Sequence, residues 1–337
     1  MKKILFATTA LVASAGIASA QGVEVSGTAE VGIVGGDRYD AADPILGYDN
    51  DNVDQLWTDV EVTFTMTGEA DNGLTFGASV QLDEAPGPHG TDDDGATWFL
   101  AFGGARLDMG DTDGAFDAAM TEVGLVGTID DTETAHAGYN GNAGLDGFYD
   151  GQIARFSYSY DAFTGHVSVE IDDTGEDAAV YGIGFSYAAD LAGVNLGFGI
   201  GHQQTEIDNN SFRNVLVPGS DGDYSVTGAS LSATTDAGIQ VVLNYSEYNQ
   251  ENWDETMTHS AIGVAYTMNA LSLGVNYGVY DDVNGVDGDE TSGYAVSMNY
   301  DLGGGLVVQA GYAESDVDAG GVDETGDNYS LGLAMSF

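Results

Sequence analysis

The chain has 337 residues, of which 55 are acidic and 6 are Lys or Arg, so its formal net charge is −49 at pH 7. Because binding to phosphate backbones requires clustered Lys and Arg, this charge excludes nucleic acid as a main partner. A hydrophobic fraction of 43%, with 50 glycines and 4 prolines, argues against disorder and favours β-strands.

The N-terminus has the features of a secretory signal peptide. Lys2 and Lys3 precede an apolar stretch too short to span a membrane, and Ala18-Ser19-Ala20 matches an A-x-A cleavage site. We therefore expect residues 1–20 to be removed on export and residues 21–337 to form one domain. Since the chain has no cysteine, the exported protein folds without disulfides or thiolate metal ligands.

Beyond the signal peptide, apolar and polar residues alternate along the chain. This period of two predicts strands with one apolar and one polar face. No apolar run approaches the roughly 18 residues that a membrane helix needs. The alternating apolar sets, in chain order, include Val60/Val62/Phe64/Met66, Phe156/Tyr158/Tyr160, Val167/Val169/Ile171, Tyr181/Ile183/Phe185/Tyr187, Leu196/Phe198/Ile200, Leu271/Leu273/Val275/Tyr277, Tyr294/Val296/Met298/Tyr300, Leu306/Val308/Ala310/Tyr312 and Tyr329/Leu331/Leu333/Met335/Phe337.

The predicted connections alternate between short and long. Short turns are predicted at 71–73, 103–104, 163–165, 190–193, 235–238, 268–270 and 303–305. Long acidic segments are predicted at 37–54, 84–94, 112–152, 172–178, 206–223, 249–255, 281–289 and 316–327. These fifteen connections join sixteen strands, an even number that lets the first and last strands pair antiparallel and close the sheet.

The segregation of short and long connections favours a membrane barrel over a soluble sandwich, in which no such regularity is required. Tilted strands of about ten residues cover a lipid-facing band of roughly 25 Å. A closed barrel also satisfies every backbone donor and acceptor within hydrocarbon. The predicted fold is therefore all-β: a 16-stranded antiparallel transmembrane β-barrel with an aqueous lumen, closed by residues 328–337.

Several stretches of the chain together carry a family resemblance. They are the strand 23–36, GLTFGASVQLDE (73–84), LDMGD (107–111) with the long loop after it, YDLGGG (300–305) and the terminal phenylalanine. Their order and spacing resemble the general porins of the alphaproteobacteria, Rhodobacter type. The resemblance implies an outer-membrane diffusion porin that passes small hydrophilic solutes and ions and contacts outer-membrane lipids.

The resemblance also implies a homotrimer with short periplasmic turns, longer external loops and a long third loop folded into the lumen. Small side chains on both faces of the predicted strand 224–234 suit protein contact in such a trimer. Segment 112–152 is far longer than an ordinary hairpin loop and is the candidate third loop.

Charged residues of the candidate third loop and of the wall are the candidate pore constriction. The loop side supplies the carboxylates of Asp111, Asp113, Asp117, Glu122, Asp130, Asp131 and Glu133. The resemblance sets such carboxylates against basic wall residues, for which the candidates are Arg38, Arg106 and Arg155. Because acids outnumber these arginines, we expect a preference for cations. Arg106 could equally pair with Asp108 on its own strand.

A calcium site is an open alternative for part of this loop. Asp111 and Asp113 flank a turn and could hold Ca²⁺ through carboxylate oxygens, as the resemblance also favours. The sequence has no complete twelve-residue EF-hand loop, and no cofactor is required for the predicted channel.

An outer-membrane β-barrel hydrolase is the alternative function. The chain has five histidines, but no G-x-S-x-G or H-E-x-x-H motif accompanies them. The sequence therefore favours a channel over an enzyme.

Overall fold

The computed structural model describes residues 22–36, 54–84, 91–149, 152–172, 177–207 and 221–337. The predicted signal peptide, residues 1–20, lies outside the described residues. Within these ranges, no helix is long and apolar enough to cross a membrane. The described residues instead form sixteen strands and three short 3-10 helices.

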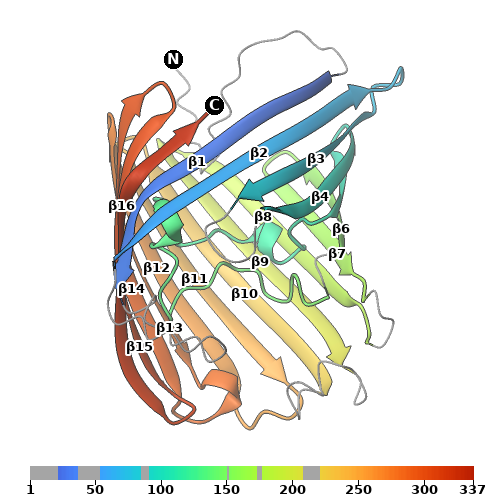
Figure 1. The fold of residues 1–337 in the computed structure, drawn as a ribbon. Helices are drawn as coiled ribbons and strands as arrows, with labels where there is room; N and C mark the ends of the chain where they lie inside the picture. Colours follow the sequence, from blue (N-terminus) through green and yellow to red (C-terminus); the bar gives the residue numbers. More distant parts are fainter. Residues whose placement is uncertain (1–21, 37–53, 85–90, 150–151, 173–176, 208–220) are drawn as a thin grey trace.

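The sixteen strands of the described ranges follow one another along the chain (Figure 1). They are β1 (Gly22–Gly36), β2 (Gln55–Glu69), β3 (Thr75–Glu84), β4 (Thr91–Phe102), β5 (Ala105–Gly110), β6 (Ile153–Tyr160), β7 (Phe163–Glu170), β8 (Val180–Leu191), β9 (Val194–Ile207), β10 (Gly222–Thr235), β11 (Ile239–Gln250), β12 (Met257–Met268), β13 (Leu271–Asp281), β14 (Glu290–Gly303), β15 (Leu306–Ala319) and β16 (Val322–Ser336). The 3-10 helices are η2 (Asp117–Ala119), η3 (Ile129–Asp131) and η4 (Val283–Gly285).

Each strand pairs antiparallel with its neighbours in the chain, and β1 pairs with β16 to close the barrel. The closing register runs from Thr28 opposite Ser336 to Gly36 opposite Asn328. This confirms the predicted 16-stranded antiparallel barrel and its closure by the last strand. With the sheet closed, each described strand has a hydrogen-bonded neighbour on both sides, as a barrel in hydrocarbon requires.

The two faces of each strand differ as the alternation predicts. On β13, Leu273, Val275 and Tyr277 are exposed on the outer face, while Gly274 and Asn276 between them are buried on the inner face. Apolar side chains exposed on the outside of a closed barrel form a surface suited to hydrocarbon.

Two predicted connections are wrong. Residues 163–165 belong to β7, and the turn before it is formed by residues 161 and 162, where Asp161 has φ 56°. Aspartate tolerates this left-handed conformation, so the turn needs no glycine. Residues 316–327 are not a loop, because β15 and β16 continue to the pair Ala319 and Val322.

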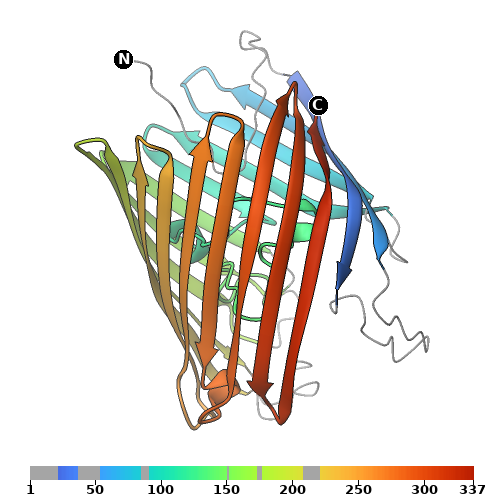
Figure 2. The ribbon, with the colours of Figure 1, turned by 90° about the vertical axis from the view of Figure 1, so that its left-hand side faces the viewer.

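The β15–β16 turn consists of Gly320 and Gly321 alone, with φ of 62° and 82°. Two-residue hairpins need positive φ at these positions, which glycine adopts without strain. The acidic residues that flank the turn extend the two strands beyond the apolar band. Figure 2 shows β15 and β16 in red running the length of the barrel, with the C-terminus at the opposite end from this turn.

Candidate functional site

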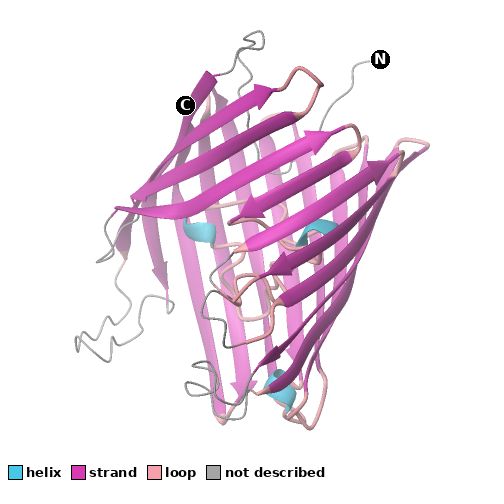
Figure 3. Ribbon diagram, turned by 90° about the vertical axis from the view of Figure 1, so that its right-hand side faces the viewer, coloured by secondary structure: helices cyan, strands magenta, loops and turns pink. Residues whose placement is uncertain are grey.

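Residues 111–149, here called the inner segment, leave β5 and run along the inward faces of the barrel wall. Figure 3 shows two short helices at mid-height within the outline of the barrel and a third at the end opposite the C-terminus. The first two are η2, beside β7, β8 and β9, and η3, beside β1, β15 and β16. We call residues 113–131 the outgoing arm and residues 133–149 the return arm.

The outgoing arm is anchored by backbone hydrogen bonds and by buried apolar side chains. The N–H of Ala115 donates to Ser168 Oγ on β7 at 2.9 Å, and the N–H of Thr121 donates to Ser230 Oγ on β10 at 3.0 Å. Phe116 and Ile129 are completely buried against the wall. Burial of two large apolar side chains favours this position by about 1.5–3 kcal/mol each.

Glycines on the inner wall let the inner segment approach closely. A methyl group at Gly184 on β8 would collide with the backbone oxygen of Ala115, and one at Gly278 on β13 would collide with the oxygen of Gly138. A methyl group would also collide with backbone atoms of the segment at Gly199, Gly201 and Gly263, and with the Val126 side chain at Gly274. Part of the high glycine content is therefore explained by inner-wall positions where the inner segment leaves no room for a side chain.

The return arm is held by asparagine side chains on distant strands. His136 Nε2–H donates to Asn276 Oδ1 at 2.5 Å, and Asn276 Nδ2 donates to the backbone oxygen of Glu133 at 2.8 Å. Asn328 Nδ2 donates to the oxygen of Ala135 at 2.9 Å. Burial lowers the pKa of His136, so its ring is neutral at pH 7.

Two of the three predicted wall arginines lie where the inner segment begins. Arg155 on β6 donates from Nη1 to the backbone oxygen of Asp113 at 2.7 Å, and its Nη2 lies 3.5 Å from Asp108 Oδ2. Arg106 on β5 pairs with Asp108 at 2.6 Å and lies over the ring of Phe99. The in-strand pairing of Arg106 and Asp108 is thus present. Arg38 lies outside the described residues.

The predicted carboxylates of the outgoing arm fall close together. Asp113 is exposed and lies 3.5 Å from Arg155 Nη1. Glu122, also exposed, accepts a hydrogen bond from the Tyr139 hydroxyl on the return arm. Partial burial, together with the charges of Asp113 and Glu122, raises the pKa of Asp117 to about 8. Asp117 therefore changes its charge within the physiological pH range.

The predicted acids nearer to η3 differ in their surroundings. Glu133 is buried, and its Oε2 accepts hydrogen bonds from Thr128 N–H at 2.9 Å and from Thr128 Oγ at 2.5 Å. Burial raises the pKa of Glu133 to about 7. Asp130 and Asp131 lie in η3 with φ of 55° and 46°, and the N–H of Asp130 donates to Glu30 Oε2 at 3.3 Å. The Glu133 carboxylate thus faces the inner segment itself and does not face open water.

The residues proposed for calcium do not supply a full ligand set. Among the side chains that the structure describes, no group of three or more His, Cys, Asp or Glu could hold a metal ion. The carboxylate of Asp113 lies beside Arg155, and the N–H of Asp111 donates to the oxygen of Ala96. Because Ca²⁺ takes six to eight oxygen ligands, Asp111 and Asp113 would supply only part of a ligand set, and the calcium site stays a prediction.

A group of wall carboxylates on β1–β3 was not among the predicted site residues. Glu30 lies opposite Asp59, and Glu61 lies opposite Asp83 in the strand register, all on the polar inner face. Their alternation with apolar residues such as Val60 gave the signal that could have found them. The lumen is therefore acidic on its wall as well as on its inner segment.

Comparison with known proteins decides the family. Residues 7–320 match the family model of the Gram-negative porins. The chain belongs to this family. It is 26% identical over 273 residues to a porin of Rhodobacter capsulatus, an alignment that covers 76% of this chain and 86% of that porin. It is 25% identical over 283 residues to a porin of Fuscovulum blasticum, which covers 82% and 80% of the two chains.

Solved porins share the barrel of this porin. A triple mutant of Rhodopseudomonas blastica porin superimposes with a TM-score of 0.61 at 16% identity, covering 94% of this chain and all of that one. A second mutant of the same porin gives a TM-score of 0.62 with the same coverage. Family and fold together make this porin a diffusion channel of the Gram-negative outer membrane, and they indicate a channel rather than an enzyme.

Proposed function

We propose that this porin is a cation-preferring channel for small hydrophilic solutes and ions, and that the inner segment forms its constriction. The proposal names Asp113 and Glu122 on the outgoing arm as the charges that an ion meets at the narrow part, with Asp117 adding a third as the pH rises through its pKa of about 8. The wall carboxylates of β1–β3, Glu30, Asp59, Glu61 and Asp83, add negative charge across the lumen.

The observation that carries the proposal is the state of the lumen arginines. Arg106 and Arg155 are the only Lys or Arg residues in the described part of the chain, and both lie within 3.5 Å of carboxylates. Their charges are thus offset locally, whereas within the described residues no salt bridge joins Lys or Arg to Glu30, Glu61 or Glu122. At physiological salt, fixed charges act over about 8 Å, which is enough to influence ions in a narrow opening.

Replacement of single ions in a planar bilayer tests this preference. We expect the conductance to fall more when K⁺ is replaced by Li⁺ than when Cl⁻ is replaced by acetate, since the two substitutes have similarly low mobility. A larger fall with acetate would mean that anions carry most of the current, and would reject the preference.

We further propose that the porin assembles as a homotrimer. Porins commonly act as oligomeric channels, and the outer face of β10 carries the small side chains of Ser225, Thr227, Ala229 and Ala233. Small side chains let a neighbouring subunit approach closely. Native mass measurement in mild detergent tests this directly, because a species of one chain alone would reject the trimer.

A further inference from the structure

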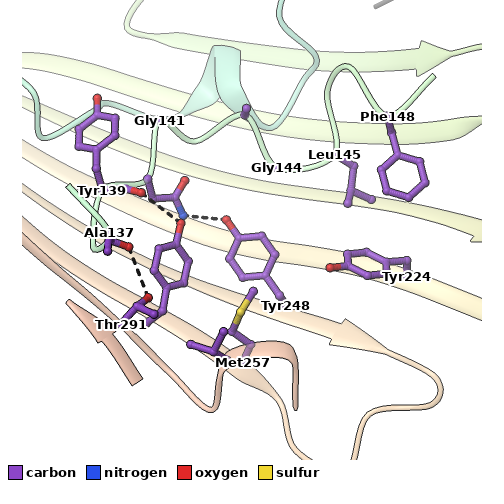
Figure 4. A pocket seen from close by; sticks show the side chains of 14 residues that line it. Ala137, Tyr139, Gly141, Gly144, Leu145, Phe148, Tyr224, Tyr248, Met257 and Thr291 are labelled. Carbon is purple, nitrogen blue, oxygen red and sulfur yellow. Dashed lines mark hydrogen bonds between the residues drawn. The ribbon is translucent and has the colours of Figure 1, made fainter. Parts of the chain in front are cut away.

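A pocket of about 490 Å³ lies between the return arm and the wall, at the end of the barrel that carries η4 (Figure 4). Residues 137–148 form one side, and the ends of β10 to β14 with η4 form the other. None of the carboxylates assigned to the constriction lines it, although Glu122 is hydrogen-bonded to the lining residue Tyr139. A solute that comes from this end of the barrel reaches the pocket before the narrow part.

Aromatic rings dominate the pocket. Phe148 and Tyr224 lie with ring centroids 6.0 Å apart at an interplanar angle of 42°, and Tyr248 and Tyr280 lie 6.3 Å apart at 51°. Because each pair is tilted, the rings form angled walls and do not stack face to face. Phe148, Tyr224 and Tyr280 remain partly accessible to solvent. Binding of a ligand that covers these apolar faces is favourable, because it removes apolar surface from water.

The polar atoms of the pocket are largely engaged with one another. Asn140 Nδ2 donates to Tyr248 Oη at 2.7 Å, and Tyr280 Oη donates to the backbone oxygen of Tyr139 at 3.4 Å. Thr291 Oγ donates to the oxygen of Ala137 at 3.4 Å. Figure 4 shows these bonds around the rings. A solute rich in hydroxyls needs several convergent hydrogen-bond partners, so this pocket suits it poorly.

The charge around the pocket favours a cation. No charged side chain among the described residues lines it, but the hydroxyl of Tyr139 in its lining is bonded to the carboxylate of Glu122. Asp281 and Asp282 precede the lining residue Val283. Aromatic faces attract positive charge through their quadrupole, and this attraction strengthens where water is partly excluded. An anion would meet negative charge and aromatic faces together.

We propose that this pocket binds organic cations that have a flat apolar body, and that bound cations reduce the ion current. The inference rests on the channel function but not on the preference of the constriction for K⁺ over Cl⁻. It assigns to the return arm a second role, in solute recognition, beside its role in narrowing the lumen.

Current block by benzyltrimethylammonium in planar bilayers tests the pocket. The compound is added to each side of the reconstituted full-length porin in KCl, and benzyl alcohol and benzenesulfonate serve as neutral and anionic probes with the same ring. We expect concentration-dependent block by benzyltrimethylammonium, stronger from one side, and little block by the other two. Equal block by benzyl alcohol would contradict the proposal that the pocket prefers cations.

Variants locate the block. Tyr224→Leu and Phe148→Leu keep apolar volume but remove a ring face, so the half-blocking concentration should rise about 3- to 10-fold. Tyr224→Phe keeps the ring and should have the same half-blocking concentration as the wild type. The same result is expected for Tyr181→Phe, on the lipid-facing side of β8. An unchanged half-blocking concentration in both leucine variants would overturn the proposal.

Conductance in KCl alone, measured for every variant, separates this result from the proposed function. Wild-type conductance in the leucine variants, with weakened block, supports the pocket whatever the K⁺ to Cl⁻ preference. Block that stays equal in all variants rejects the pocket even in a cation-preferring pore.

Discussion

Arg155 on β6 fastens the first residues of the inner segment to the barrel wall, through its 2.7 Å hydrogen bond to the backbone oxygen of Asp113. The same guanidinium lies 3.5 Å from both the Asp108 and the Asp113 carboxylates. One side chain thus has a structural effect on the position of the segment and an electrostatic effect on its charge.

Arg155→Gln should change both properties. Loss of a charged hydrogen bond, which is worth about 1.5–3 kcal/mol, should loosen the start of the segment and increase the noise of the open-channel current. Loss of the positive charge should increase the permeability ratio of K⁺ to Cl⁻. Arg155→Lys, which keeps the charge, is the control. It should show the increased current noise but a smaller change in the permeability ratio of K⁺ to Cl⁻. A lower ratio in Arg155→Gln would contradict this account.

Asp117 should make the cation preference depend on pH. Its pKa is raised to about 8, so its carboxyl is mostly protonated at pH 6 and mostly ionised above pH 9. The permeability ratio of K⁺ to Cl⁻ should therefore increase as the pH rises from 6 to 9. Asp117→Asn should give a smaller increase. If the wild type and the variant show the same pH profile, Asp117 does not act on permeating ions.

Glu133 should make thermal stability depend on pH. The folded state raises its pKa from 4.5 to about 7 and so favours the protonated form. The stability from this group is complete below pH 4.5 and is lost as the pH rises through 7. Glu133→Gln should therefore reduce the fall in unfolding temperature between pH 5 and pH 8. Calorimetry in detergent measures this, and an undiminished fall would assign the pH dependence to other groups.

Gly184 and Gly165 form a matched pair for the contact between wall and segment. A methyl group at Gly184 would collide with Ala115, whereas one at Gly165 on the neighbouring strand has no heavy atom within 4 Å. Gly184→Ala should therefore cost about 1–3 kcal/mol through overpacking or displace the outgoing arm, and change the single-channel conductance. Gly165→Ala should leave conductance unchanged. Equal conductance in both variants would mean that the segment does not rest on β8.

The barrel itself could be predicted from the sequence because lipid and water impose opposite demands on alternate residues. The pattern fails where both faces meet water, as at Asp316 and Asp318 on β15. There the backbone pairing continues without an apolar face, so an acidic strand resembles a loop. The turn at Asp161 was predicted at the wrong position for a different reason. Gly165, which is common in turns as a residue type, lies within the following strand.

The candidate site was predictable only in part. The length and acidity of segment 112–152 indicated where charge would gather, but its contacts join residues far apart in the chain. Asn276 and Glu133 lie 143 positions apart, and no local pattern links them. Burial of Glu133 and exposure of Glu122 depend on those contacts, so the sequence could not separate their roles.

The reversal potential in a tenfold KCl gradient tests the central claim, that the acids of the lumen outweigh its paired arginines. For the wild-type porin at pH 7.5, with 0.1 M KCl on the concentrated side, we expect the dilute side to become positive, because K⁺ crosses more readily than Cl⁻. This potential should shrink when both solutions are raised to molar salt, since screening then shortens the reach of fixed charges to about 3 Å. A negative dilute side in the 0.1 M gradient would show that Arg106, Arg155 or other cations control the narrowest part, and would contradict the account.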